Sequence, residues 1–269
     1  MRIHLFTTDI SCIKLLDHLV GDEVTALIIP SNRVDSPKIE LLREEAQRRG
    51  IPLSTHQRGR PVDESLAPVD AGISWLYSQI IVASDLRKYP AGILNMHGGV
   101  VPDYRGASVL HWSIINGEDQ LGITWHEIVE AVDAGPIWAE SRIPIAPHAT
   151  ALDIRGDMIK EGRRLFPEAW AAFRLRSASA RYADLSGGRI WPQRKPADGI
   201  IDSGWTERRV RDMVRALCSP WPPATIEVDG VLRAIDRVNN APSPEAIAYD
   251  TADGTRLYLN LAPEETPRE

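Results

Sequence analysis

The feature that most constrains the fold is the alternation of apolar runs and charged helical segments in the first third of the chain. Residues 2–7 and 24–29 are apolar runs of the length expected for buried strands, and a helical pattern follows each. Strands and helices that alternate through short connections predict an α/β fold with a doubly wound, mostly parallel sheet. The elements expected here are strands at 2–7, 24–29, 51–53 and 71–76, one helix through Ile13, Leu16 and Leu19, and a second helix at about 38–49.

The end of the first expected strand argues against a dinucleotide site. The chain reads Thr7-Thr8-Asp9-Ile10 there and lacks the Gly-x-Gly-x-x-Gly turn that approaches a pyrophosphate. Near the end of the strand at 71–76, Trp75 and Tyr77 have two interpretations. They line a pocket for a flat heteroaromatic ring, or they pack in the core, and the sequence leaves both open.

Three polar side chains follow apolar strands in the central part of the chain. Residues 91–94 form an apolar run, and Asn95 and His97 after it share one face because the side-chain period of a strand is two. Asp133 comes after a later apolar segment. Since ligands bind at the carboxyl ends of strands in open parallel sheets, these groups predict a reaction centre. An amide, an imidazole and a carboxylate suit acyl transfer to an amine.

The order and spacing of short motifs around these residues resemble a known family. The matching segments are Asn95-x-His97, the Pro-x-Tyr-Arg-Gly run at 102–106, Asn116-Gly117-Glu118, Gly122-Ile123-Thr124 and Asp133-Ala134-Gly135-Pro136. They resemble the formyltransferases that use 10-formyltetrahydrofolate, which include methionyl-tRNA formyltransferase and the sugar N-formyltransferases. The resemblance implies a Rossmann-like formyltransferase fold and 10-formyltetrahydrofolate as cosubstrate.

The resemblance also implies roles for individual residues. His97 is the expected base, because imidazole titrates near neutral pH, and Asn95 is the expected donor to the oxyanion. Asp133 would orient His97 or accept the amine proton through water. No metal is expected, since His126-Glu127 lacks the second histidine of a zinc motif. The expected cosubstrate-binding residues are Leu76, Tyr77, Ser78, Gln79, Ile80, Ile81, Val129 and Asp133, and the expected substrate-binding residues are Gly98, Gly99, Tyr104 and Arg105.

Two departures from the tRNA enzymes favour a small amine as acceptor. Those enzymes resemble this chain but carry a longer basic loop after the second strand, where this chain has only residues 30–37 with one arginine and one aspartate. They also carry a Gly-Thr-Pro turn that Thr7-Thr8-Asp9 does not match. The expected substrate is a nucleotide-linked amino deoxysugar used in lipopolysaccharide or glycan biosynthesis, and nucleic acid is not expected as a partner. The alternatives are a methionyl-tRNA formyltransferase, a hydrolase that releases formate and a non-catalytic folate-binding protein.

Composition and charge are consistent with this assignment. The formal net charge of −6 gives no basic footprint for nucleic acid. Two distant cysteines, Cys12 and Cys218, fit a reducing cytoplasm, and neither a signal peptide nor a membrane-spanning run is expected. We therefore predict a cytoplasmic protein that does not interact with membranes, with a homodimer as an open alternative.

The second half of the chain predicts a boundary between two domains. The expected helices are at 107–116, at 150–176 with a kink or split near Pro167, and at 206–217. The stretch 177–196 is loop-like, and short extended segments at 225–228, 231–238 and 256–261 predict a small β-rich appendage. We predict a catalytic domain over residues 1–185 and a linker with a small C-terminal domain over residues 186–269.

Overall fold

The computed structural model describes residues 1–178, 180–244 and 246–263 and divides the chain into two compact units. Unit 1 contains residues 1–105, 122–142 and 158–190, and unit 2 contains residues 106–121, 143–157 and the described residues from 191 onward. The units alternate along the sequence. The predicted division into domains at residues 1–185 and 186–269 remains a prediction.

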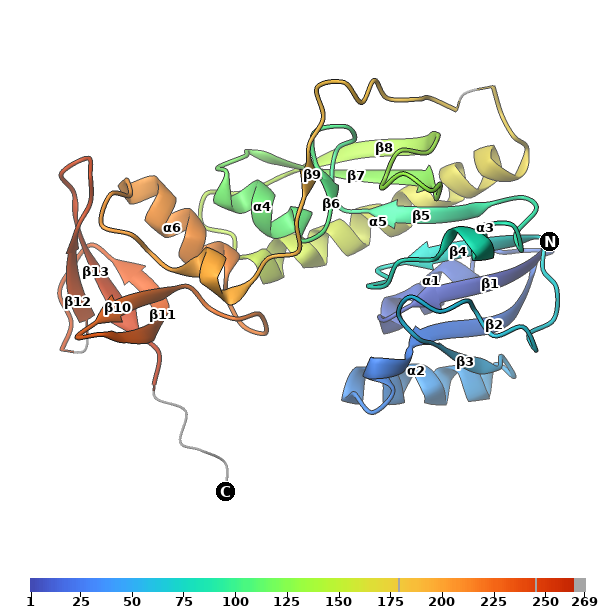
Figure 1. Ribbon diagram of the computed structural model, residues 1–269, viewed down its shortest axis with the longest axis horizontal. Helices are drawn as coiled ribbons and strands as arrows, with labels where there is room; N and C mark the ends of the chain where they lie inside the picture. Colours follow the sequence, from blue (N-terminus) through green and yellow to red (C-terminus); the bar gives the residue numbers. More distant parts are fainter. Residues whose placement is uncertain (179, 245, 264–269) are drawn as a thin grey trace. The chain divides into compact units, whose positions relative to one another are not determined.

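The main sheet has seven strands in the order β3-β2-β1-β4-β5-β7-β8 (Figure 1). The first five strands in the chain pair in parallel, and β7 runs antiparallel to β5. This arrangement confirms the predicted doubly wound, mostly parallel sheet. The strands are β1 (Arg2–Thr7), β2 (Glu23–Pro30), β3 (Leu53–His56), β4 (Ala71–Trp75), β5 (Ile93–His97), β7 (Gln120–Glu127) and β8 (Ile137–Pro144).

The helices follow the sequence pattern with three differences, one of which is the short helix α3 (Ala83–Leu86), which was not predicted. The helices are α1 (Ile13–Leu16), α2 (Pro37–Arg48), α3, α4 (Val109–Ile115), α5 (Ala151–Arg174) and α6 (Glu207–Ala216), with 3₁₀ turns at Ile10–Cys12, Ser31–Arg33 and Pro196–Gly199. The first helix ends at Leu16, so its predicted extension through Leu19 is wrong. The chain turns after this helix, and Gly21 in the turn adopts the left-handed backbone conformation. Leu19 lies in the turn, where its side chain is buried.

Helix α5 is continuous through Pro167, so the predicted split is wrong. Proline removes one backbone hydrogen bond from a helix interior. The flanking residues Phe166 and Trp170 are buried, and their rings stack with centroids 6.1 Å apart. We attribute the continuity of the helix to this packing, which offsets the lost hydrogen bond.

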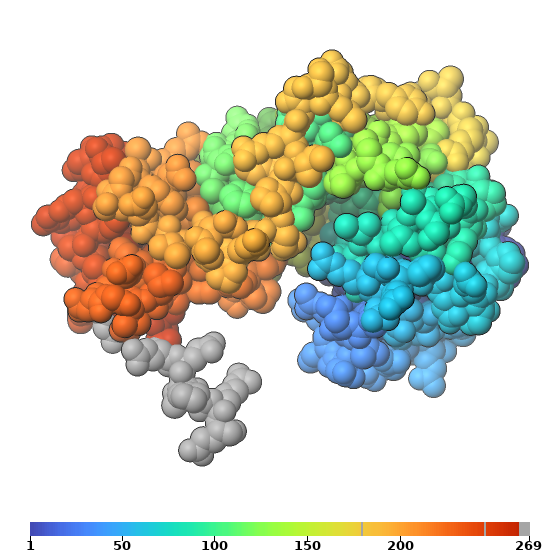
Figure 2. All heavy atoms as spheres, viewed as in Figure 1, coloured from blue at the N-terminus to red at the C-terminus, as the bar shows by residue number. Residues whose placement is uncertain are grey.

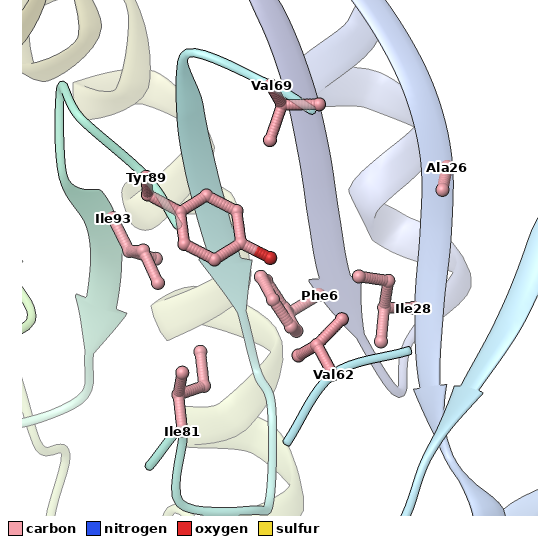
Figure 3. Packing of buried hydrophobic residues seen from close by; sticks show 8 residues of the cluster. All are labelled: Phe6, Ala26, Ile28, Val62, Val69, Ile81, Tyr89 and Ile93. Atoms are coloured by element: carbon pink, nitrogen blue, oxygen red, sulfur yellow. The ribbon is translucent and has the colours of Figure 1, made fainter. Parts of the chain in front are cut away.

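The core of unit 1 contains aromatic side chains. Figure 3 shows Phe6 and Tyr89 meeting between strands, with Val62 and Ile81 beside them. Trp75 is fully buried and stacks on Trp125 at 5.7 Å, so the interpretation of Trp75 as a pocket residue is wrong and its core interpretation holds. Helix α5 approaches this tryptophan pair closely.

Gly162 is the residue of α5 at this approach. A Cβ atom on Gly162 would lie 3.1 Å from the Trp75 ring, and the carbonyl oxygen of Gly162 accepts a hydrogen bond from Nε1 of Trp125. A larger side chain would therefore separate the helix from the sheet. The glycine fixes the depth at which α5 packs.

Unit 2 contains an antiparallel sheet in the order β10-β11-β13-β12 beside α6 (Figure 1). Its strands are β10 (Thr225–Val228), β11 (Val231–Asn239), β12 (Ala246–Asp250) and β13 (Arg256–Leu261). Three of them match the predicted segments and confirm a small β-rich region. The fourth, β12, was not predicted, because its sequence Ala-Ile-Ala-Tyr-Asp offers only a short apolar signal.

Two peripheral features complete the description. A two-stranded sheet joins β6 (Arg105–Gly106) to β9 (Ile190–Trp191), and the segment 181–190 before β9 lies largely exposed on the surface (Figure 2). Among the helices in the described part of the chain, none is both long enough and apolar enough to cross a membrane.

Candidate active site

The carboxyl end of β5 positions two of the predicted residues, and β7 adds a third side chain beside them. Asn95 and His97 lie two residues apart in β5, and the antiparallel pairing with β7 sets Asn95 opposite His126. Asp133 lies in the loop between β7 and β8. Its φ of 44° is in the left-handed region, which aspartate tolerates better than most residues and which is common at functional sites.

These four side chains, which we call the strand-end cluster, are in mutual contact. Nδ1 of His97 lies 3.6 Å from Oδ2 of Asp133, and Nε2 of His126 lies 3.3 Å from Oδ1 of the same carboxylate. Nδ2 of Asn95 lies 3.0 Å from Nε2 of His126. The structure therefore brings the predicted Asn95, His97 and Asp133 together, with His126 as a fourth member.

Backbone carbonyl groups determine which nitrogen of each ring carries the proton in the neutral state. Nε2 of His97 lies 2.5 Å from the carbonyl oxygen of Tyr104, and Nδ1 of His126 lies 2.9 Å from the carbonyl oxygen of Glu127. A carbonyl oxygen only accepts, so each of these nitrogens donates. Neutral His97 therefore presents its lone pair at Nδ1, and neutral His126 presents its lone pair at Nε2. Both lone pairs face Asp133.

Burial controls the titration of His97. The side chain is only 7% exposed, and loss of solvation lowers its pKa from the ordinary value. The carboxylate of Asp133 opposes this effect, while the imidazole of His126 adds to it. His97 is consequently a neutral base at neutral pH, next to a carboxylate that would stabilise its charged form.

The turn after β5 closes over His97. A Cβ atom on Gly99 would lie 2.7 Å from Nε2 of His97, so only glycine allows this approach. The carbonyl oxygen of Gly99 accepts a hydrogen bond of 2.7 Å from Oγ1 of Thr124. Among the other predicted substrate residues, Gly98 and Tyr104 are half-buried, and buried Arg105 donates from Nε to the carbonyl oxygen of Val132 at 2.8 Å.

The loop after β4 contains six of the eight predicted cosubstrate residues, those at 76–81. Leu76 has φ of 50°, a rare conformation for a bulky residue, and its carbonyl oxygen accepts a 2.6 Å hydrogen bond from Oγ1 of Thr8. Ile81 anchors the other end of the loop in the core, while Ile80 between them is 67% exposed. Ser78 is exposed as well, and Gln79 is half-buried. The loop therefore combines a strained backbone, fixed ends and an exposed apolar side chain.

The side chain of Tyr77 is a further fixed point of this loop. Nε2 of His56 lies 2.8 Å from the carbonyl oxygen of Arg60 and must donate to it, so Nδ1 of His56 accepts the Tyr77 hydroxyl proton at 2.7 Å. Burial raises the pKa of Tyr77, which keeps the hydroxyl protonated as this bond requires. Val129, the remaining predicted cosubstrate residue, is 37% exposed in the loop after β7.

The comparisons with known proteins identify the family. Residues 36–170, just over half of the chain, match the family model described as formyl transferase. The chain belongs to the formyl transferase family. Membership in this formyltransferase family confirms the resemblance found over residues 95–136. The strand-end cluster lies within the matched segment.

Solved structures with the same fold as this formyltransferase cover nearly the whole chain. An N-formyltransferase from Helicobacter canadensis in complex with folinic acid and dTDP-3-aminofucose is 17% identical, with a TM-score of 0.73 over 97% of this chain and 99% of that one. A 4-N formyltransferase from Francisella tularensis is 16% identical, with a TM-score of 0.72 over 98% of both chains. HypX from Aquifex aeolicus is 20% identical, with a TM-score of 0.63 over 96% of this chain and 45% of that one. At these identities the likeness establishes the fold.

His126 is the cluster residue that sequence reasoning missed. The sequence around His126 shows only an incomplete zinc motif in an alternating segment, and neither feature indicates which residues lie next to the side chain. The signal that could have found it is the pairing of β7 with β5, because the register sets His126 opposite Asn95. A strand pattern alone does not give that register.

Proposed function

We propose that this formyltransferase transfers a formyl group from 10-formyltetrahydrofolate to the amine of a nucleotide-linked amino deoxysugar. The observation that carries the proposal is the strand-end cluster, which sets Asn95 and His97 around one carboxylate in the family fold. An acceptor amine must lose a proton during transfer, and the formyl oxygen gains charge. The cluster offers a base for the proton and an amide donor for the oxygen.

The residues around the loop after β4 fit a folate cosubstrate. Leu76 holds a strained backbone, and Ile80 and Val129 present exposed apolar side chains. Oε1 of Gln79 is a buried acceptor without a hydrogen-bond partner among the described residues. A pterin ring offers both a flat apolar surface and N–H donors. We infer that residues 76–81 and Val129 hold this ring, with Asp133 at its inner end.

The chemistry divides among three side chains. When bound, 10-formyltetrahydrofolate supplies the formyl carbon for attack and a leaving nitrogen that takes up a proton. Asn95 donates from its amide to the formyl oxygen. His97 receives the amine proton at Nδ1, because its Nε2 already donates to Tyr104. Asp133 then faces the new N–H and stabilises the imidazolium.

The loop after β2 favours a small acceptor over tRNA. Strand β2 ends at Pro30 and α2 begins at Pro37, and the connection carries a single 3₁₀ turn. It contains Arg33 and Asp35 as its only charged residues. A loop that contacts several phosphates needs more positive charge. Two of the solved structures with this fold are described as N-formyltransferases, one as a 4-N formyltransferase and one in complex with folinic acid and dTDP-3-aminofucose. Either amine position suits the proposal.

An acceptor screen tests this function. The purified protein is incubated with 10-formyltetrahydrofolate and a panel of 3-amino and 4-amino deoxysugar nucleotides, and products are measured by mass spectrometry. We expect a gain of one formyl group on at least one sugar. Transfer to methionyl-tRNA alone, with a steep dependence on salt, would support the tRNA alternative instead. Formate release without an acceptor would indicate a hydrolase, and folate binding without either reaction a binding protein.

A further inference from the structure

The contacts of His126 indicate that this side chain does more than fill space in the core. Its ring is nearly fully buried, and each nitrogen has a partner: the carbonyl oxygen of Glu127 at Nδ1, and both Asn95 and Asp133 at Nε2. Because Nδ1 donates to the carbonyl, the neutral ring accepts at Nε2. That acceptor fixes the Asn95 amide with its NH₂ group toward His126. The orientation of the predicted oxyanion donor is therefore set by His126.

The same tautomer creates an electrostatic conflict that one proton resolves. In the neutral cluster the lone pairs of His97 Nδ1 and His126 Nε2 both point at the carboxylate of Asp133, at 3.6 Å and 3.3 Å. Two lone pairs beside an anion repel it, and burial strengthens the repulsion. A proton placed on either ring converts one repulsive contact into an ion pair. The cluster is thus built to accept one proton.

We propose that His126 is a positioning residue that orients Asn95 and shares with His97 and Asp133 the proton released by the acceptor amine. This inference rests on the proposed formyl transfer. The amine nitrogen forms a bond to the formyl carbon and loses one proton, which enters the cluster at Nδ1 of His97. The proton leaves the cluster to the folate nitrogen as the bond between that nitrogen and the formyl carbon breaks. Atoms and charge balance without another reactant.

The groups that face His126 determine how its removal acts. They are Asn95 and His97 from β5 and Asp133 from the loop between β7 and β8, and Arg105 from β6 binds the neighbouring carbonyl of Val132. Asp133 raises the pKa of His97 and His126 lowers it. Loss of His126 and loss of the Asp133 charge should therefore shift the titration of His97 in opposite directions. If His126 only filled space, its loss would leave the pKa of His97 unchanged.

Kinetics on three variants of the full chain test the proposal. We expect His126→Phe to lower kcat by roughly tenfold to a hundredfold, near the lower end of general-base effects, with KM for the amino sugar changed less than about twofold. The acid limb of the pH profile should move to higher pH in His126→Phe and to lower pH in Asp133→Asn. His126→Gln should recover part of the kcat, because its amide oxygen can accept from Asn95, while its acid limb stays shifted. His148→Gln, at an exposed histidine, is the matched control.

Imidazole ¹⁵N spectra of the labelled protein give a readout that does not need an acceptor. We expect neutral His126 to carry its proton on Nδ1 and His97 to carry its proton on Nε2. The midpoint of His97 titration should rise in His126→Gln. An Nε2–H tautomer of His126, or an unchanged His97 midpoint, would overturn the proposal. Failure of the acceptor screen with these spectra as expected would refute the formyl transfer and leave the cluster assignment standing.

Discussion

The strand-end cluster and the region around His111 each contain a histidine that is buried to nearly the same extent, but the two side chains have different neighbours. His97 is 7% exposed and His111 is 8% exposed, and burial lowers the pKa of both. His97 faces Asp133, which opposes the effect of burial. Near His111 the charged neighbour is Arg194, which lowers the pKa further, to about 4. One imidazole is buried beside an anion, and the other near a cation.

Hydrogen bonding separates the two regions as clearly as charge does. Each ring nitrogen of His97 lies near an acceptor group, whereas neither nitrogen of His111 has a hydrogen-bond partner among the described residues. His111 instead meets the ring of Trp221 edge to face, with centroids 4.7 Å apart. Burial of a histidine therefore does not mark function by itself. A half-buried carboxylate next to the ring and a strand-end position distinguish the functional candidate.

The largest effect that separates the regions is expected from removal of the base. His97→Ala should abolish measurable turnover because it removes the base, and Asp133→Ala because it removes the carboxylate that stabilises the charged base, in each case a loss of roughly a hundredfold to ten-thousandfold. Folate affinity should remain, since the family resemblance implies that the segment at residues 76–81 holds the cosubstrate largely through backbone groups. Calorimetry and single-turnover assays measure the two quantities. Loss of folate binding together with activity would show that these residues hold ligand or structure instead.

A smaller loss is expected from the amide. Asn95→Ala should reduce kcat by about a hundredfold, the cost typical of one lost oxyanion donor, with little change in the acid limb of the pH profile. The parallel variant His111→Phe should leave kcat within about twofold of wild type. Steady-state assays at several pH values compare the two. Equal losses in both variants would erase the distinction between the regions.

The sequence predicts the buried parallel strands because their apolar runs are continuous. The predicted run at 71–76 differs from β4 by one residue, and the predicted segments at 225–228 and 256–261 match β10 and β13. Local signals fail where packing decides: α5 continues through Pro167, and β12 forms from a weak segment held by β13. Asn95, His97 and Asp133 could be predicted because their spacing in the sequence resembles that of the family. His126 joins them only through the register between β5 and β7.

A third effect concerns stability in acid. The folded-state pKa of His111, about 4, lies below the value near 6.5 for an unfolded chain. As pH falls from about 6.5 toward 4, the unfolded chain binds a proton that the folded chain refuses, so stability falls, by at most about 3 kcal/mol at pH 4. His111→Phe should make this decline shallower. Urea unfolding of both proteins at pH 7, 6 and 5 measures the difference, and parallel curves would contradict the prediction.

The smallest effect is expected from the same variant at neutral pH. Phenylalanine keeps the edge-to-face contact with Trp221 and removes two buried nitrogens that have no partner among the described residues. A buried polar group left unsatisfied costs about 1–3 kcal/mol, so His111→Phe should stabilise the protein by about 1 kcal/mol at pH 7.5. The matched change His126→Phe should destabilise it, because Asn95 and the Glu127 carbonyl each lose a hydrogen-bond partner. Thermal unfolding of the two variants side by side therefore distinguishes a buried imidazole that the fold tolerates from one that it uses, and equal signs would refute the distinction.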